Sequence, residues 1–328
     1  MARRFASIDV GTNTVLLLVA ERRDDGTFFA VDERMELTRL GRGVDRTHLL
    51  DAAAIEETVA AVRDFAAAAR DAGADDLVIT ATSAARDARN GGAFFDAVRD
   101  ACGVVPEVLS GEEEARLSYE SARRDFGQAD ALAVMDVGGG STELIFGVGG
   151  ELLFARSLDV GAVRLTERWL HSDPPSAGEL AALRADLAQP FAKLGADLAP
   201  HFAKREVDHP SQPAPPSPPP GASLVGVAGT VTTLCALHLG LDAYDGSLVH
   251  GQRLALPAIR TLANRLANLD LAARKALPCL PPKRADVIVA GAELVAELME
   301  ALGFEELIVS DRGVRWGLLY DRFGARAS

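Results

Sequence analysis

Three short turns of small residues follow apolar, strand-like segments: Gly11-Thr12-Asn13-Thr14, Gly138-Gly139-Gly140-Ser141-Thr142 and Gly229-Thr230. Glycine permits close backbone approach, so the N–H and hydroxyl groups of such turns can point at phosphate oxygens. Any one of these turns could instead end a strand for structural reasons. Three turns in one chain, two of them preceded by an aspartate, predict phosphate binding. No GxxxxGK[ST] pattern is present, which argues against a P-loop enzyme.

Carboxylates stand beside these turns at positions that suit a divalent cation. Asp9 and Asp136 come at the ends of the strand-like segments, and Glu143 lies two residues beyond Ser141. Mg²⁺ at phosphate sites takes carboxylate oxygens, directly or through water. An aspartate at a strand end can also serve only to cap a turn. We predict that Asp9, Asp136 and Glu143 hold Mg²⁺ (or Mn²⁺).

The candidates for the chemical step are glutamates and one arginine. The run from Glu112 to Glu114 opens a helix predicted to be capped by Ser110. Acidic residues there complement the helix dipole, which is the preferred interpretation of Glu112. Glu113 and Glu114 are candidate catalytic residues, because a glutamate near a terminal phosphate can orient and deprotonate water. Arg86 could neutralise charge on the transferred phosphoryl group, or could be a surface arginine.

Composition limits the function classes. The 328 residues are 48% hydrophobic and 25% charged, enough for two domains with ordinary cores. The net charge of −13 argues against a general nucleic-acid binder, so a polyanion must be held by local groups. No apolar run reaches bilayer length and no signal-peptide pattern opens the chain, so no membrane association is expected.

The reactive side chains outside the turns have structural interpretations. Cys102, Cys235 and Cys279 lie far apart in apolar contexts without a CxxC pair, which predicts buried reduced thiols and a cytoplasmic location. His250 lies in a turn-like, polar setting, where a satisfied structural histidine is the preferred interpretation. Neither group is predicted to perform catalysis.

An internal repeat is the main structural signal. The segment Ile8-Asp9-Val10-Gly11 matches Met135-Asp136-Val137-Gly138, and each is followed by a second apolar strand. Two copies of an apolar-Asp-Val-Gly hairpin predict two similar lobes, each offering an aspartate and a glycine turn to a shared cleft. A Rossmann start would place a helix directly after the glycine turn.

The other predicted elements alternate between strands and helices, which indicates an α/β protein. Further strands are expected over Thr27–Asp32, Leu77–Thr80, Val104–Leu109, Leu224–Ala228 and Leu307–Ser310. Helices are expected over Asp51–Ala72, Phe94–Ala101, Arg164–Leu170, Ser176–Leu198, Asp286–Leu302 and Val314–Phe323, and from Gly111 and Gly229 onward. The proline-rich segment 209–221 is predicted to be a tolerated surface excursion or, alternatively, a partner-docking segment.

These motifs resemble, in order and nearly end to end, those of the Ppx/GppA phosphatases within the actin–hexokinase–Hsp70 superfamily. The resemblance rests on the three turns, on Ala81-Thr82-Ser83-Ala84-Ala85-Arg86-Asp87, on Ser110-Gly111-Glu112-Glu113-Glu114-Ala115-Arg116-Leu117 and on Asp136-Val137-Gly138-Gly139-Gly140-Ser141-Thr142-Glu143-Leu144. Two C-terminal blocks also match, Arg284-Ala285-Asp286-Val287-Ile288 and Val309-Ser310-Asp311-Arg312-Gly313-Val314-Arg315.

The resemblance implies two ribonuclease-H-like lobes of the actin-like ATPase fold. The first lobe is expected over residues 1–125, closed by the C-terminal helix 313–328, and the second over residues 126–312. By motif position Glu114 corresponds to the family's proposed general base, and Arg86, Asp136 and Glu143 to catalytic and metal-proximal positions. Gly138, Gly139 and Gly229, with Asn13, Ser141 and Thr230, match phosphate-binding positions. A homodimer is implied by the resemblance alone.

The implied reaction is Mg²⁺-dependent removal of terminal phosphate from inorganic polyphosphate. Because the chain ends at Ser328 without the HD-like domain of long members, shorter polyphosphate chains are expected as substrates. Hydrolysis of guanosine pentaphosphate (pppGpp) by the same residues is the nearest alternative. A small-molecule kinase or ATPase of the same superfold, and a catalytically silent sensor, are further alternatives.

Overall fold

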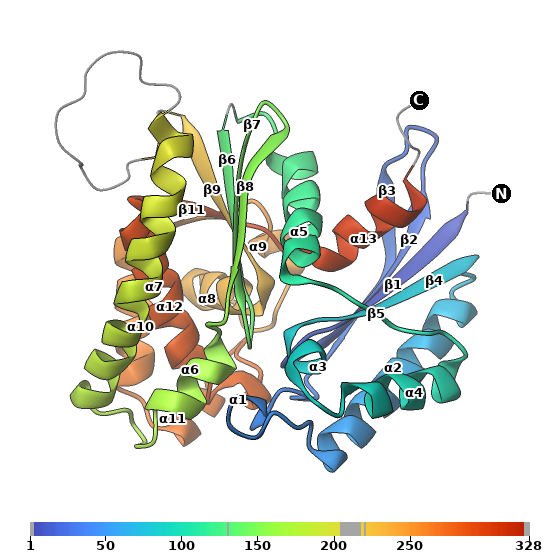
Figure 1. Cartoon of the computed structure of the whole chain (residues 1–328), viewed down its shortest axis with the longest axis horizontal. Helices are drawn as coiled ribbons and strands as arrows, with labels where there is room; N and C mark the ends of the chain where they lie inside the picture. The colour runs from blue at the N-terminus through green and yellow to red at the C-terminus, as the bar shows by residue number, and fades with distance from the viewer. Residues whose placement is uncertain (1–2, 130, 204–217, 220, 325–328) are drawn as a thin grey trace. The chain divides into compact units, whose positions relative to one another are not determined.

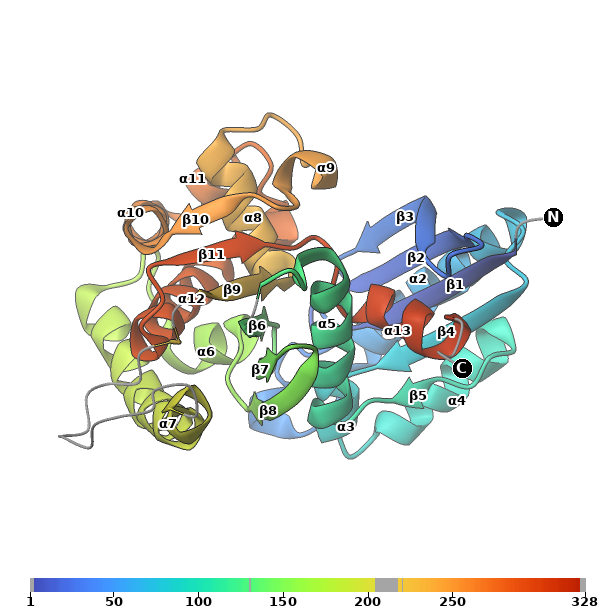
Figure 2. The same cartoon turned by 90° about the horizontal axis from the view of Figure 1, so that it is seen from above.

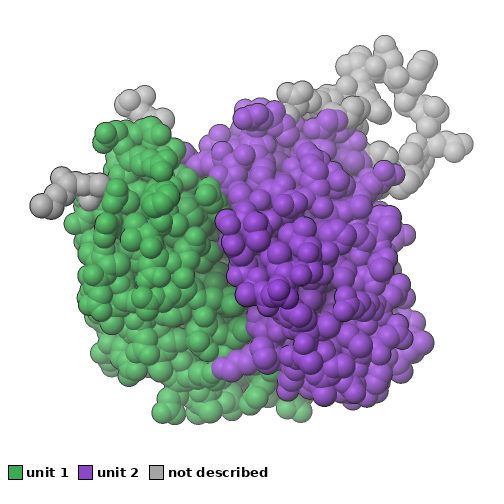
Figure 3. Space-filling model, turned by 180° about the vertical axis from the view of Figure 1, so that it is seen from behind, with its two compact units in different colours: residues 1–121, 312–328 green, residues 122–311 purple. Residues whose placement is uncertain are grey.

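The computed structural model describes residues 3–129, 131–203, 218–219 and 221–324. The chain divides into two units, with Met1–Ser121 and Arg312–Ser328 in unit 1 and Ala122–Asp311 in unit 2 (Figure 3). The sequence-based lobe boundaries after residues 125 and 312 remain a prediction. The proline-rich segment 209–221 lies almost entirely outside the described residues.

Unit 1 contains a five-stranded mixed sheet in the order β3-β2-β1-β4-β5 (Figure 1). Strand β1 (Arg4–Val10) pairs antiparallel with β2 (Val15–Arg22), which pairs antiparallel with β3 (Phe28–Glu36). On its other side β1 runs parallel to β4 (Asp76–Ala81), and β4 to β5 (Glu107–Val108). The central position of β1 places the first glycine turn at the end of the middle strand.

Helices cover both faces of this sheet. They are α1 (Val44–Thr47), α2 (Ala52–Asp71), α3 (Ser83–Asp87), α4 (Gly91–Cys102), the first part of α5 (Gly111–Phe126) and α13 (Val314–Phe323). Helices α2 and α4 bury Val62 and Phe94 against Ile8 of β1. Helix α13 lies on the opposite face (Figure 2). Its Trp316 belongs to one apolar cluster with Leu18 of β2.

The start of α2 illustrates how local sequence sets these elements. The Asp51 side chain accepts hydrogen bonds from the Ala53 and Ala54 N–H groups, as an N-cap residue does. Gly73 takes a positive φ of 75° just after the helix, where a side chain would be strained. Both positions agree with the sequence-based prediction for this helix.

Strand β3 forms one edge of the sheet in unit 1. Phe29, Val31 and Met35 are exposed there, and the same strand carries the charged residues Asp32, Glu33, Arg34 and Glu36. Charged side chains on an open edge discourage pairing with another chain.

Unit 2 contains a six-stranded mixed sheet in the order β10-β11-β9-β6-β7-β8 (Figure 1). The strands are β6 (Ala131–Val137), β7 (Thr142–Val148), β8 (Glu151–Leu158), β9 (Ala222–Val227), β10 (Arg253–Ala255) and β11 (Glu306–Val309). Strand β6 pairs antiparallel with β7 and parallel with β9. Strand β6 therefore takes the same place in its sheet as β1 does in unit 1.

The helices of unit 2 pack into one apolar core with this sheet. They are α6 (Ala162–Trp169), α7 (Ala177–Ala203), α8 (Ala228–Leu239), α9 (Gly246–Val249), α10 (Leu256–Ala267), α11 (Leu271–Lys275), the 3₁₀ helix η1 (Pro282–Arg284) and α12 (Ile288–Leu302). Nearly every residue of α12 is buried, as its continuous apolar sequence predicts.

The two sheets share one connectivity, which confirms the predicted α/β class with two ribonuclease-H-like lobes. In each unit the first three strands form an antiparallel meander, and the fourth pairs parallel with the first. Strands β8 and β10 were absent from the sequence-based prediction. Strand β10 has only three residues, and β8 mixes polar with apolar residues.

Candidate functional site

The turn between β1 and β2 is closed by its own backbone. The Gly11 N–H group donates to the Thr14 carbonyl at 2.9 Å. The hydroxyl groups of Thr12 and Ser83 lie 2.8 Å apart, which links the turn to the first residue of α3. Gly11, Thr12 and Asn13, the predicted phosphate-binding residues of unit 1, therefore lie on a turn of fixed shape.

The turn between β6 and β7 repeats this closure in unit 2. The Gly138 N–H group donates to the Ser141 carbonyl at 3.1 Å. Gly139 lies between them, and Ser141 is buried. The hydroxyl of Thr142 donates to the Val160 carbonyl at 2.7 Å, so this predicted phosphate ligand has an internal partner.

The carbonyl groups of this second turn are occupied by the start of α6. The donors are the backbone N–H groups of Ala162 and Val163 and Nε of Arg164, which contact the carbonyls of Gly138, Gly139 and Gly140 at 3.0, 2.9 and 2.9 Å. Oxygen atoms engaged in this way are not presented to an anion. The Gly138 N–H group is engaged with Ser141, so the other N–H groups of the turn are the candidates for phosphate binding.

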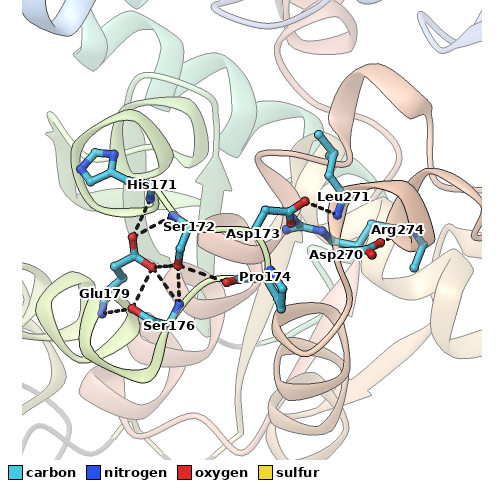
Figure 4. A network of polar contacts seen from close by, with 10 residues as sticks. His171, Ser172, Asp173, Pro174, Ser176, Glu179, Asp270, Leu271 and Arg274 are labelled. Carbon is cyan, nitrogen blue, oxygen red and sulfur yellow. Dashed lines mark hydrogen bonds and ion pairs between the residues drawn. The ribbon is translucent and has the colours of Figure 1, made fainter.

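The connection after α6 is fixed by a polar network (Figure 4). The Glu179 carboxylate accepts the backbone N–H groups of His171, Ser172 and Ser176 at 2.7–2.9 Å. Hydrogen bonds to Ser172 and Ser176 hold the pKa of Glu179 well below its ordinary value. This network anchors the far end of the helix whose start supports the second turn.

An ion pair ties the same connection to α11. The Asp173 carboxylate contacts the buried Arg274 guanidinium at 2.8 Å and accepts the Leu271 N–H group at 2.9 Å (Figure 4). Burying an arginine is tolerated when a carboxylate pairs with it.

The third glycine motif opens α8. The Gly229 carbonyl accepts Oγ1 of Thr233 at 2.6 Å and Nη1 of Arg284 at 3.0 Å. Arg284 also donates to the Thr233 hydroxyl at 2.7 Å. Burial lowers the pKa of Arg284 to about 10, so the group stays protonated at neutral pH. Thr230 is buried beside Gly291 of α12, which fixes the start of α8.

Glu114 and Arg86 are neighbours in unit 1. Oε2 of Glu114 lies 3.8 Å from Nη1 of Arg86, and the Glu114 residue is only 9% exposed. Arg86 also donates to the Leu109 carbonyl at 2.9 Å and contacts Asp87 at 3.6 Å. The structure thus brings together two predicted catalytic residues from α3 and α5.

Glu113 has a different environment from Glu114. Its carboxylate accepts the N–H and hydroxyl groups of Ser110, both at 2.9 Å, while the Ser110 hydroxyl accepts the Glu113 N–H group at 3.2 Å. This reciprocal arrangement is a capping box. The hydrogen bonds lower the pKa of Glu113. Its predicted catalytic role stays a prediction, and Glu112 is exposed.

The predicted metal ligands fall in both units. Asp136 and Glu143 face each other directly across the β6–β7 ladder, and Ser157 donates to Oε1 of Glu143 at 2.7 Å. In unit 1, Thr80 donates to Oδ1 of Asp9 at 3.4 Å. Among the described residues no group of three or more His, Cys, Asp or Glu side chains is arranged to hold a metal. Two carboxylates nevertheless fit Mg²⁺, which commonly completes its shell with substrate phosphates and water.

His250 makes contacts that suit a structural role, and the three cysteines form no disulfide. Nδ1 of His250 accepts the Asp311 N–H group at 3.3 Å, and its Nε2 lies 3.7 Å from Asp125. This agrees with the structural interpretation of His250. All three cysteines are free, but only Cys102 and Cys235 are buried, so the prediction that Cys279 is buried is wrong.

Sequence reasoning missed several residues that support the turns. Ser83, the start of α6 and Arg284 lie far from the turns along the chain. Arg284 belongs to a matched motif, yet nothing in its local sequence indicates that it contacts Gly229. Their roles depend on long-range contacts, which residue spacing does not encode.

Two mixed sheets of one connectivity, with glycine turns at the ends of their central strands, are the two ribonuclease-H-like lobes of the actin-like ATPase fold. The chain belongs to the Ppx/GppA phosphatase family, which matches residues 18–325. No helix in the described part of the chain is long and apolar enough to cross a membrane.

Individual relatives cover nearly the whole chain. The chain is 36% identical to Exopolyphosphatase 2 of Mycobacterium tuberculosis, over 96% of this chain and 97% of that protein. It is 30% identical to Exopolyphosphatase 1 of the same organism, over 99% of this chain and 89% of that protein. The crystal structure of the Aquifex aeolicus Ppx/GppA family member is 30% identical with a TM-score of 0.77, covering 98% and 97% of the two chains.

Proposed function

We propose that this protein is an exopolyphosphatase, which hydrolyses the terminal phosphoanhydride of inorganic polyphosphate and releases orthophosphate. The observation that carries the proposal is the buried Glu114 carboxylate beside Arg86, in a chain that is 36% identical to an exopolyphosphatase over nearly its full length. A carboxylate beside a fixed cation is suited to water activation next to a charged phosphoryl group.

In the proposed reaction Glu114 accepts a proton from water as the water oxygen bonds to the terminal phosphorus. The bond between that phosphorus and its bridging oxygen breaks, and the shortened chain leaves with the bridging oxygen and its electron pair. Arg86 stabilises the charge that develops on the transferred phosphoryl group. The amide groups of the glycine turns bind the phosphates of the substrate.

Asp136 and Glu143 would hold Mg²⁺ in this scheme. The cation would screen the charge of the phosphate chain when bound. Four statements remain predictions: that Asp9 is a third metal ligand, that both units serve one site, that the protein is a homodimer and that it is cytoplasmic.

The proposal is tested by phosphate release from polyphosphate with two neighbouring variants. Glu114→Gln removes the base without changing shape, and we expect turnover to fall by about 10²- to 10⁴-fold. Glu112→Gln, an exposed residue two positions earlier on the same helix, is the matched control and should keep wild-type turnover. Near-wild-type turnover by Glu114→Gln would reject the assigned base.

Hydrolysis of pppGpp is the alternative that uses the same residues. Initial rates on short polyphosphate, long polyphosphate and pppGpp decide between the two substrates and test the expected preference for shorter chains. A clear preference for pppGpp would replace the proposed activity while keeping the same catalytic residues.

A further inference from the structure

The first glycine turn, like the second, is held by a segment from elsewhere in its own unit. The Gly41 N–H group donates to the Thr12 carbonyl at 2.8 Å, and the Arg39 N–H group to the Asn13 carbonyl at 3.1 Å. The carbonyls of this turn are therefore engaged by residues that follow β3. The same is true in unit 2, where the start of α6 engages the carbonyls of the second turn.

The two supporting segments occupy equivalent places in the repeat. Gly41 follows β3, the third strand of unit 1, and Gly161 follows β8, the third strand of unit 2. Each glycine precedes a helix, α1 or α6, and each lies against the turn that joins the first two strands of its own unit. The internal repeat thus extends beyond the Asp-Val-Gly hairpins, although the residues around Gly41 and Gly161 share no obvious motif.

Both glycines leave no room for a side chain. A Cβ atom on Gly41 would lie 2.2 Å from Cγ2 of Thr12, 3.1 Å from the Thr12 carbonyl oxygen and 3.2 Å from Cβ of Ala84. A Cβ atom on Gly161 would lie 2.4 Å from the Gly139 carbonyl oxygen and 2.6 Å from the Gly140 nitrogen. The backbone of Gly161, with φ of −161°, is ordinary extended chain, so contact rather than conformation requires glycine there.

We propose that Gly41 and Gly161 are paired positioning residues of the phosphate-binding turns. By allowing the supporting segment to touch the turn, each glycine keeps the turn carbonyls bonded away from the substrate. The turn N–H groups other than those of Gly11 and Gly138, which donate to Thr14 and Ser141, are then left for phosphate. This inference rests on the proposed function, because the ligand of the turns is taken to be a phosphate chain.

The first test uses Gly41→Ala and a rescue variant. The added methyl group must displace the Thr12 side chain, whose hydroxyl bonds Ser83. We expect KM for polyphosphate to rise about 10-fold with kcat changed less than about 3-fold, because turn amides bind substrate and transition state alike. Thr12→Ser removes Cγ2 and keeps the hydroxyl, so Gly41→Ala/Thr12→Ser should recover most of the lost affinity.

Gly92→Ala is the matched control within unit 1. Gly92 lies inside α4, and its Cβ would meet no atom within 4 Å. This variant should keep KM and kcat at wild-type values. If Gly41→Ala and Gly41→Ala/Thr12→Ser have equal thermal unfolding temperatures but different KM values, then Gly41→Ala acts on the position of the turn and not on folding.

Gly161→Ala tests the second turn. Its Cβ would meet backbone atoms only, so no side-chain change can relieve the contact, and we expect a loss of kcat/KM larger than about 10-fold. Gly178→Ala, whose Cβ would meet nothing within 4 Å, is the control in unit 2.

Polyphosphate binding can be measured as the rise in unfolding temperature that polyphosphate causes. This measurement distinguishes failure of the positioning proposal from failure of the proposed function. If the wild type binds or hydrolyses polyphosphate and Gly41→Ala does so equally well, the positioning inference is overturned alone. A failure of Thr12→Ser to restore KM would also overturn it. If the wild type neither binds nor hydrolyses polyphosphate, the proposed function falls and this inference falls with it.

Discussion

Asp136 and Glu143 lie directly opposite each other on β6 and β7 and are 7% and 1% exposed. Two carboxylates facing each other across a ladder repel, and their burial adds to the cost. A divalent cation between the substrate and these oxygens would offset that repulsion. The pair is therefore the part of the predicted metal site that the fold supports best.

Asp136→Asn should raise the Mg²⁺ concentration that gives half-maximal phosphate release by about 10-fold, because one anionic ligand is lost. The measurement is a Mg²⁺ titration of initial rates on polyphosphate. Asp159→Asn, an exposed aspartate of the same unit, is the control and should keep the wild-type titration. An identical Mg²⁺ dependence in Asp136→Asn would exclude Asp136 as a ligand.

The capping box of α5 allows the effects of Ser110 and Glu113 on stability to be measured apart from their effects on catalysis. Ser110→Ala removes the N-cap hydroxyl and should lower the free energy of unfolding by about 1 kcal/mol. Glu113→Gln preserves the capping box, so its unfolding free energy should stay close to wild type. Urea titration of both variants measures this.

Phosphate release by Glu113→Gln then decides the role of Glu113. Because Ser110 already occupies its carboxylate, we expect Glu113→Gln to retain most of the turnover. A loss as large as that of Glu114→Gln would restore Glu113 as a catalytic residue.

Arg284 should contribute to stability through the third turn. Arg284→Met leaves the Gly229 carbonyl with one fewer donor and removes a hydrogen bond to Thr233. The free energy of unfolding should fall by about 2 kcal/mol, since the Gly229 carbonyl and the Thr233 hydroxyl each lose one hydrogen bond. Arg265→Met, an exposed arginine on α10, is the control for charge removal, and an equal effect of both variants would contradict the assigned contact.

Glu179 should make stability depend on pH in acid. The folded state lowers its pKa below the ordinary value of 4.5, so the unfolded chain binds protons more readily. The stabilisation is therefore complete above that value and is lost as pH falls through the folded pKa. The unfolding temperature of the wild type should exceed that of Glu179→Gln at neutral pH, and the gap should narrow below about pH 4. A gap independent of pH would show that the carboxylate charge is not responsible.

The hairpins were predictable because their signal is local. In Ile8-Asp9-Val10-Gly11 and Met135-Asp136-Val137-Gly138 the apolar run, the strand-end aspartate and the glycine occur within four residues. The cap of α2 at Asp51 is local in the same way. Such patterns determine an element without reference to the rest of the chain.

The supports of the turns could not be predicted in this way. Gly41, Gly161 and Arg284 act through contacts with residues 21 or more positions away, and their roles depend on which elements pack together. The different environments of Glu113 and Glu114 could also not be predicted from the sequence. Sequence spacing did not reveal that Glu113 turns back to Ser110 while the adjacent Glu114 is buried beside Arg86.

The open edge of β3 bears on how this protein avoids aggregation. Phe29, Val31 and Met35 would make that strand an attractive template for a foreign strand if they stood alone. Asp32, Glu33 and Arg34 separate Val31 from Met35 and are held in ion pairs, Asp32 with Arg34 and Glu33 with Arg315. An incoming strand would have to bury or displace these charges. Replacing Asp32 and Arg34 with threonine would remove part of that barrier and keep the ion pair between Glu33 and Arg315, and the otherwise well-folded protein would then be expected to form assemblies through this edge.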